Sequence, residues 1–194
     1  MPDIFIAAAS TVTAADLPSA RLGQRFGRLD QQSQLALLAV ASLGINFDEL
    51  PRDRVGICLA ASAGSLTTDV NFWNGRTGAG GPSPTLFAYT LPSAAVGEVA
   101  IHFRLTGPNL CFVGDDAVVL PEAFALIERG EADACVCVAC EMVSAECARV
   151  TGLPEASTAR ALFLKRGSGI LPEREFGRDM KALCQLILQS KSAG

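Results

Sequence analysis

A turn at residues 114–117 has the setting in which many enzymes place a nucleophile. It reads Gly114-Asp115-Asp116-Ala117 and lies between an apolar strand-like run and a helical pattern. Such a turn exposes a side chain at a helix N-terminus, where the helix dipole stabilises an anion. It contains no Ser, Cys or Thr. Adjacent Asp residues beside a glycine more often cap backbone N–H groups than form a metal or acid–base pair.

Cysteines are the next candidates for chemistry. Cys111 is nearest the turn, but it lies in mid-strand, so we expect it to pack rather than to act as a nucleophile. Cys135, Cys137 and Cys140 form a C-x-C-x-x-C pattern. On a strand the first two share one face and the third takes the other, and no second Cys/His cluster completes a tetrahedral site. We therefore expect no metal site and no other cofactor.

The single histidine, His102, lies in a predicted helix ahead of the sequence Thr106-Gly107-Pro108. The simplest interpretation is a packed or surface helix residue. Without a second basic group near the turn, no base–nucleophile pair can be assembled there.

The composition restricts the classes of function. Of the 194 residues, 49% are hydrophobic and 19% are charged, which predicts a large core and leaves open whether a partner covers part of the surface. The net charge is −4 and no Lys/Arg-rich block is present, which argues against nucleic acid. No uncharged apolar run reaches about 18 residues, and the N-terminus lacks a basic region, so we expect neither a membrane span nor a signal peptide. Seven cysteines in such a chain predict reduced thiols and a cytoplasmic location.

Apolar runs predict an α/β fold. The runs are mostly continuous rather than alternating, as in strands that are covered on both faces. We expect strands at Ile4–Ser10, Arg54–Ala61, Asn109–Val113, Asp133–Cys140 and Ala159–Arg166. We expect helices at Leu29–Leu43 with Asp30 as a possible cap, Ser93–Phe103, Pro121–Arg129 and Arg174–Gln189. The Gly/Pro-rich stretch Gly75–Pro84 is predicted to be a loop, residues 1–189 a single domain, and residues 190–194 a frayed tail.

Four short sequences, in a fixed order, carry a resemblance to a known family. They are Arg28-Leu29-Asp30 with Ser33-Gln34-Leu35-Ala36; Arg54-Val55-Gly56-Ile57 running to Ser62-Ala63-Gly64-Ser65; Tyr89-Thr90-Leu91-Pro92-Ser93 leading to Thr106-Gly107-Pro108; and Ile127-Glu128-Arg129-Gly130 with Asp133-Ala134 and Cys140-Glu141. Over roughly residues 4–166 the chain resembles the N-terminal half of a β-ketoacyl synthase. The resemblance implies a thiolase-like half: a mixed sheet of about five strands with helices on both faces.

Two departures from that family bear on activity. In the family, the strand after the Gly-Pro pair ends in a motif whose Cys takes up the acyl chain. By position, residues Gly114, Asp115, Asp116 and Ala117 would be a degenerate version of that turn, because a carboxylate cannot replace a thiolate that attacks a thioester and then leaves. Pro121 favours a first helical turn, so we expect the next helix to begin late, near Leu120–Pro121, after a remodelled loop 114–120. The second departure is length: the family's catalytic His, or His and Asn, come from a second half.

The resemblance leaves several functions open. The first is a non-catalytic subunit of the chain-length-factor type, without catalytic residues of its own. It would pair with an active β-ketoacyl-ACP synthase, or lacking one with a second copy of itself, in fatty-acid, polyketide or polyene biosynthesis. The acyl carrier protein would be engaged by the partner and only indirectly by this chain. The second is a small acyltransferase or condensing enzyme that uses Cys111, or a hydrolase that uses Asp115 and Asp116; the third is a degenerate fragment without a role.

The expected partner surface lies within residues 84–113. In the family, the strand after the Gly-Pro pair lies at the dimer axis, and an apolar edge strand needs a cover. Bulky residues near the junction ahead of the preceding helix end the partner's acyl tunnel in a chain-length factor. We therefore expect an interface at Phe87, Tyr89, Leu91, Leu110, Cys111, Phe112 and Val113. Phe72 and Trp73 could be either partner anchors or plugs of this domain's own core.

Overall fold

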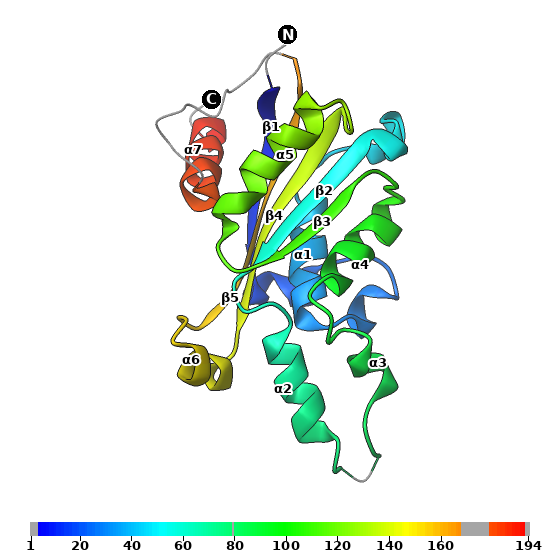
Figure 1. The fold of residues 1–194 in the computed structure, drawn as a ribbon, viewed down its shortest axis with the longest axis vertical. Coiled ribbons are helices and arrows are strands. Elements are labelled where there is room, and N and C mark those ends of the chain that lie inside the picture. Colours follow the sequence, from blue (N-terminus) through cyan, green and yellow to red (C-terminus); the bar gives the residue numbers. More distant parts are fainter. Residues whose placement is uncertain (1–3, 79, 168–178, 193–194) are drawn as a thin grey trace.

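Five strands form one mixed sheet (Figure 1), in a computed structural model that describes residues 4–78, 80–167 and 179–192. The strands are β1 (Ile4–Thr13), β2 (Val55–Ala61), β3 (Asn109–Val113), β4 (Ala134–Val143) and β5 (Ala156–Arg166). Their order is β1-β5-β4-β2-β3. β2 pairs in parallel with β3 and with β4, whereas β5 runs antiparallel to β4 and β1. The predicted mixed sheet is confirmed, and all the predicted strands belong to it.

The sheet separates two hydrophobic cores. β2 is buried along its whole length, and β4 is buried from Ala134 to Cys140. Along β2, Ile57 and Leu59 face one core, and Cys58 and Ala60 face the other. Burial on both faces is therefore the reason for the continuous apolar sequences.

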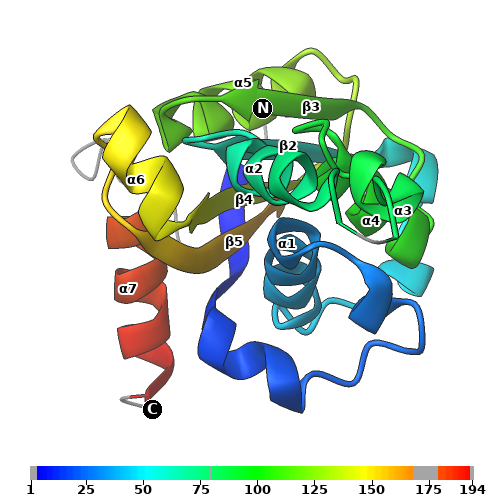
Figure 2. The same ribbon diagram turned by 90° about the horizontal axis from the view of Figure 1, so that it is seen from below.

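Long helices cover both faces of the sheet (Figure 2). α1 (Gln31–Ala41) and α4 (Ala94–Phe103) lie on one face, and α5 (Val119–Glu128) and α7 (Met180–Ser192) lie on the other. Asp30 caps α1 as predicted, because its Oδ1 accepts a hydrogen bond from the backbone N–H of Ser33 at 3.0 Å. The predicted covering of both faces is confirmed.

Three further helices lie beyond the carboxyl ends of the parallel strands, at the lower end of the molecule in Figure 1: α2 (Leu66–Gly75), α3 (Pro84–Phe87) and α6 (Ala145–Thr151). Neither α2 nor α6 was predicted. α2 is rich in Thr, Val and Asn, which are weak helix formers. α6 is short, and the Ser144 Oγ caps it by accepting from the N–H of Cys147 at 3.3 Å.

The C-terminal helix differs from its predicted extent. We expected a helix over Arg174–Gln189, and residues 174–178 lie outside the described part of the chain. α7 extends to Ser192, so residues 190–192 belong to a helix rather than to the expected frayed tail. None of the helices in the described ranges is both long and apolar enough to cross a lipid bilayer.

Candidate functional site

The β3–α5 turn, residues 114–117, lies where β3 leaves the sheet. Gly114 has φ +126°, a conformation that favours glycine, and its N–H donates to the carbonyl of Ala61 at 3.1 Å. Asp115 Oδ1 then accepts from the N–H of Ala117 at 3.0 Å and caps a 3-10 turn, η5 (Asp116–Val118). Asp115 therefore has the capping role that its position beside a glycine predicted.

The helix after this turn begins earlier than the sequence predicted. η5 runs directly into α5 at Val119, so the helical segment starts immediately after Asp115. Pro121 is the third residue of α5, where its missing N–H still falls among the first four that lack an intrahelical partner. The predicted start near Leu120–Pro121 is within one or two residues of the observed start of α5, whereas the expected loop 114–120 is partly helical because η5 occupies residues 116–118. The β3–α5 turn therefore lies at the N-terminal end of a continuous helical segment that begins with η5.

Polar side chains from other strand ends surround the turn. Ser62 follows β2 directly and Glu141 lies near the end of β4, and the Ser62 hydroxyl donates a hydrogen bond to the Glu141 carboxylate. The carboxyl ends of β2, β3 and β4 lie at one edge of the sheet because these strands are parallel, which is where open α/β sheets place their sites. The parallel order could therefore have marked Ser62 and Glu141 as site residues, which the sequence reasoning did not do.

The carboxyl groups at this edge hold their protons more tightly than usual. Burial raises the pKa of the Asp116 carboxyl, and the negative charges of Asp115 and Asp179 raise it further, while Arg160 opposes the shift. Burial likewise raises the pKa of Glu141, against the Ser62 hydrogen bond and with a further rise from Asp116. The site is therefore a half-buried cluster of carboxyl groups with the Arg160 guanidinium of β5 beside it. Nothing in the sequence pattern of β5 marked Arg160 as part of it.

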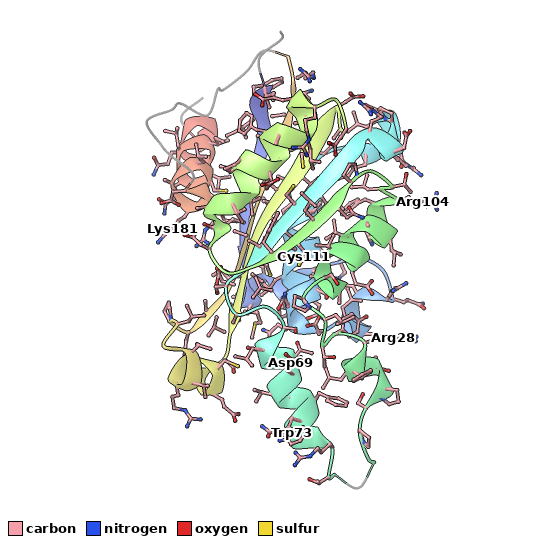
Figure 3. The ribbon with its side chains drawn as sticks, viewed as in Figure 1. Arg28, Asp69, Trp73, Arg104, Cys111 and Lys181 are labelled. Atoms are coloured by element: carbon pink, nitrogen blue, oxygen red, sulfur yellow. The ribbon has the colours of Figure 1, made fainter. Side chains whose placement is uncertain are left out.

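Neither Cys111 nor His102 provides a nucleophile or a base at the turn. Cys111 lies in the middle of β3 (Figure 3), and burial raises the pKa of its thiol, which disfavours the reactive thiolate. His102 is exposed near the end of α4, with its ring 4.7 Å from that of Phe103. Because α4 leads into the start of β3, His102 lies toward the opposite end of that strand from the turn.

The remaining cysteines are packing residues. Cys135 and Cys137 face the core beneath α5, whereas Cys140 faces the core beneath α1, as the strand periodicity predicted. All seven cysteines carry free thiols. In the described part of the chain, no group of three or more His, Cys, Asp or Glu side chains is arranged to hold a metal ion.

A partly exposed apolar surface adjoins the turn. β3 is an edge strand, and all its residues are half-buried or exposed. A Cβ built at Gly64 would lie 3.3 Å from the side chains of both Pro92 and Val113, so the segment after α3 adjoins the end of β3. The exposed fractions reach 61% at Phe87, 64% at Leu91 and 62% at Val113. We call Phe87, Leu91, Leu110, Cys111, Phe112 and Val113 the edge surface.

Tyr89, the remaining residue of the expected interface, is anchored inward. It is half-buried, and its hydroxyl donates to Glu98 Oε1 at 3.2 Å. Glu98 also pairs with Arg25 at 2.8 Å, and with only 8% of its surface exposed it is a buried carboxylate. Tyr89 therefore supports the segment that carries Phe87 and Leu91 rather than projecting from it.

Phe72 and Trp73 have different environments on α2. The Phe72 ring lies 5.4 Å from that of Phe87, so Phe72 packs beneath the edge surface. Trp73 is 61% exposed at the far end of α2 (Figure 3), with the Arg76 guanidinium 3.6 Å from its ring centroid. Neither residue is among the buried core residues of the described chain, so neither plugs the core.

Comparisons with known sequences identify the family. Residues 11–157 match the sequence model of the family described as "Beta-ketoacyl synthase, N-terminal domain". The 3-oxoacyl-[acyl-carrier-protein] synthase 2 of Staphylococcus aureus is 28% identical over 121 residues, which are 56% of this chain and 29% of that protein. The chain thus covers less than a third of the length of this curated relative.

Two solved structures are similar in fold. A chain of the ishigamide ketosynthase/chain length factor superposes with a TM-score of 0.66 at 18% identity, covering 84% of this chain and 62% of that one. A chain from the complex of the ketosynthase ApeO with its chain length factor ApeC, from Xenorhabdus doucetiae, gives a TM-score of 0.64 at 20% identity, covering 87% and 81%. With the family match over most of its length and this thiolase-like architecture, the chain belongs to the β-ketoacyl synthase family and corresponds to its N-terminal domain.

Proposed function

We propose that this chain is a non-catalytic ketosynthase-like subunit of the chain-length-factor type, which pairs with an active β-ketoacyl-ACP synthase. The observation that carries the proposal is the edge surface: an uncharged apolar edge strand that lies directly before a turn without a nucleophile. An apolar strand edge left open is an aggregation hazard unless another chain covers it.

The chemistry of the β3–α5 turn supports a role without catalysis. A condensing enzyme needs a thiolate that accepts an acyl group and releases it, and the residues at this helix N-terminus are Asp115 and Asp116. The Asp115 carboxylate is occupied as a helix cap. Burial raises the pKa of the Asp116 carboxyl, which lies beside Glu141, and so favours its protonated form, which is not nucleophilic.

The similar structures support the choice of partner. Two of them are complexes of a ketosynthase with a chain length factor. This chain and the matched chain of the Xenorhabdus complex superpose over similar fractions of their lengths. A chain of nearly the same length as this one therefore occurs in such a complex. By analogy, the acyl chain on its carrier protein would be held by the partner synthase, and the product would be a fatty acid, polyketide or polyene. Seven free thiols support a cytoplasmic location.

Association with a synthase tests the proposal directly. The chain would be co-expressed with the β-ketoacyl-ACP synthase encoded nearest to it, and the complex measured by light scattering and calorimetry. Val113→Asp should weaken binding on the order of a hundredfold, because it places an unpaired charge in the covered surface. Val150→Asp is the matched control: Val150 is 80% exposed on α6, and its replacement should leave binding unchanged.

Two outcomes would contradict this assignment. Equal affinities of the Val113→Asp and Val150→Asp variants would exclude the edge surface as the contact. A chain that remains monomeric alone and in the presence of the synthase would exclude the paired subunit. If the chain alone forms a stable dimer that Val113→Asp dissociates, the edge surface is still the contact. The partner is then a second copy of this chain rather than a synthase.

The alternative enzyme, an acyltransferase that uses Cys111, makes a different prediction. The purified chain incubated with acyl and malonyl thioesters should give no acyl adduct by mass spectrometry and no malonyl decarboxylation, because burial keeps Cys111 protonated. An adduct that is lost in Cys111→Ala would establish the alternative. An adduct that is lost in Asp116→Asn would establish a carboxylate nucleophile instead.

A further inference from the structure

A cleft of about 330 Å³ lies at the opposite end of the sheet from the β3–α5 turn. It forms where the parallel strands β2 and β4 begin and the antiparallel strand β5 ends. The register pairs Val55 with Ala134 and Ala134 with Lys165, so these three side chains stand in a row on one face of the sheet. Leu50 and Pro51, which precede β2, complete the apolar walls. The volume is within the range of about 300–1,000 Å³ that is typical of small-molecule sites.

Positive charge predominates at this cleft. Its lining contains the cations Arg54, Lys165 and Arg166 and a single carboxylate, Asp133. Arg54 is held by that carboxylate, with Nη2–Oδ1 at 2.9 Å, and by the Gly130 carbonyl at 2.8 Å. The cleft therefore retains two cations that its own carboxylate does not balance.

Those two cations differ in their freedom to bind a ligand. The Arg166 guanidinium donates to the carbonyl of Ile127, and it also lies close enough to the Asp133 carboxylate to help lower the pKa of that group, so its charge is partly compensated. The Lys165 ammonium lies 5.6 Å from the ring centroid of Phe5. Within the described ranges, no carboxylate oxygen lies within 4.0 Å of the Lys165 ammonium. An ammonium on a flexible stem beside apolar walls is suited to a carboxylate whose body is apolar.

We propose that this cleft binds a small amphipathic carboxylate. The carboxylate group contacts Lys165, with Arg166 adding a longer-range attraction, and the hydrocarbon body lies against Leu50 and Pro51, above the buried Val55 and Ala134. This site is separate from the edge surface, because its residues come from the other end of the sheet. It therefore stands or fails separately from the proposed function.

Octanoate is the probe for the test, in an NMR titration of the whole ¹⁵N-labelled chain. Saturable shifts should be confined to residues 50–55, 133–134 and 165–166. Lys165→Gln should raise the dissociation constant about tenfold, since it removes one charged hydrogen bond. Lys181→Gln is the matched control, an exposed lysine on α7 (Figure 3), and should leave the constant unchanged. Octanol, which has the chain without the charge, should bind at least about tenfold more weakly.

The proposal is overturned if octanoate gives no saturable shifts, or if the shifts are spread over the molecule. Equal dissociation constants for Lys165→Gln and Lys181→Gln would also overturn it. A second variant, Ala134→Leu, fills the floor of the cleft and should abolish the shifts while the remaining spectrum stays folded. If Ala134→Leu unfolds the chain, Lys165→Gln decides alone, because its side chain is exposed and its replacement leaves the core intact.

Discussion

The two edge strands of the sheet, β1 and β3, differ in how far the rest of the chain covers them. β1 has ten residues, most of them buried, and it is covered by α1 on one face and by α7 on the other. β3 has five residues, and none of them is fully buried. Helices of this chain thus cover both faces of the edge strand β1, while the edge strand β3 carries part of the exposed edge surface. The difference teaches that this chain's own cores cover the apolar residues of β3 only in part: Leu110, Cys111 and Phe112 pack against them, whereas Val113 is left exposed.

The largest expected effect is a difference in unfolding free energy between charge substitutions on the two edge strands. Ile6 on β1 is 3% exposed, and Ile6→Asp should cost about 3–5 kcal/mol of unfolding free energy, since it buries an unpaired charge. Val113→Asp on β3 should change the stability of the unassembled chain by less than about 0.5 kcal/mol. Urea unfolding of both variants at concentrations where the chain is monomeric measures the contrast. Equal losses at the two positions would mean that β3 is as much a part of the monomer's core as β1.

The next effect concerns how β3 is fixed to the sheet on its inner side. Gly107 precedes β3, and a Cβ built there would lie 2.3 Å from the carbonyl oxygen of Val55. Gly107→Ala should therefore cost about 1–3 kcal/mol, because the backbone of one strand must move. Gly97 on α4 has no atom within 4 Å of a built Cβ, and Gly97→Ala should stabilise the chain by about 0.5–1 kcal/mol. If thermal unfolding shows Gly107→Ala to be more stable than Gly97→Ala, the backbone at residue 107 does not lie as close to the Val55 carbonyl as the structure indicates.

The sequence predicted the two edges unequally well. Every strand was found, because short continuous apolar runs such as that of β4 are typical of strands that are buried on both faces. β1 was predicted to end at Ser10 and extends to Thr13, since its last residues pair with β5, a contact that no local pattern records. The helices α2 and α6 were missed because tertiary contacts determine α2 and a single cap determines the short helix α6, rather than helix propensity.

The candidate site was predicted only in part. Asp115 was recognised as a cap, because the adjacent glycine makes that role local. Pro121 located the start of α5 to within one or two residues, but the 3-10 turn η5 ahead of it was not predicted. The contact between Ser62 and Glu141 joins residues from two different strand ends, so only the strand order could have brought them together. The inward orientation of Tyr89 depends on the buried Glu98, which the helix pattern alone did not identify.

A smaller effect tests the exit of β3, where the open edge meets α5. Asp115→Ala should lower the unfolding free energy by about 1 kcal/mol, since it leaves the Ala117 N–H without its cap. Asp115→Asn should be nearly neutral, because Asn accepts the same hydrogen bond. Chemical denaturation of the two variants measures the difference. If Asn destabilises as much as Ala, the carboxylate charge rather than the cap is what matters at this turn.

The smallest expected effect is a pH dependence at the same end of the sheet. The pKa of the Asp116 carboxyl is raised by burial and by the charges of Asp115 and Asp179, against the opposing charge of Arg160. A carboxyl whose pKa is higher in the folded state than in the unfolded state favours folding while it is protonated. Its contribution is fully present below its unfolded pKa of about 3.9 and is lost as the pH rises through the higher folded value.

Asp116→Asn removes this titration and keeps the shape of the side chain. Relative to the wild type, the melting temperature of Asp116→Asn should therefore increase as the pH is raised from about 4 to 7. Glu155→Gln, at an exposed position before β5, is the control and should show no such trend. Circular dichroism melts across this pH range give the two difference curves. A difference that is constant with pH would mean that Asp116 is no more protonated in the folded chain than in the unfolded one. The end of β3 would then be an ordinary solvated turn, and the contrast between the two edges would rest on apolar exposure alone.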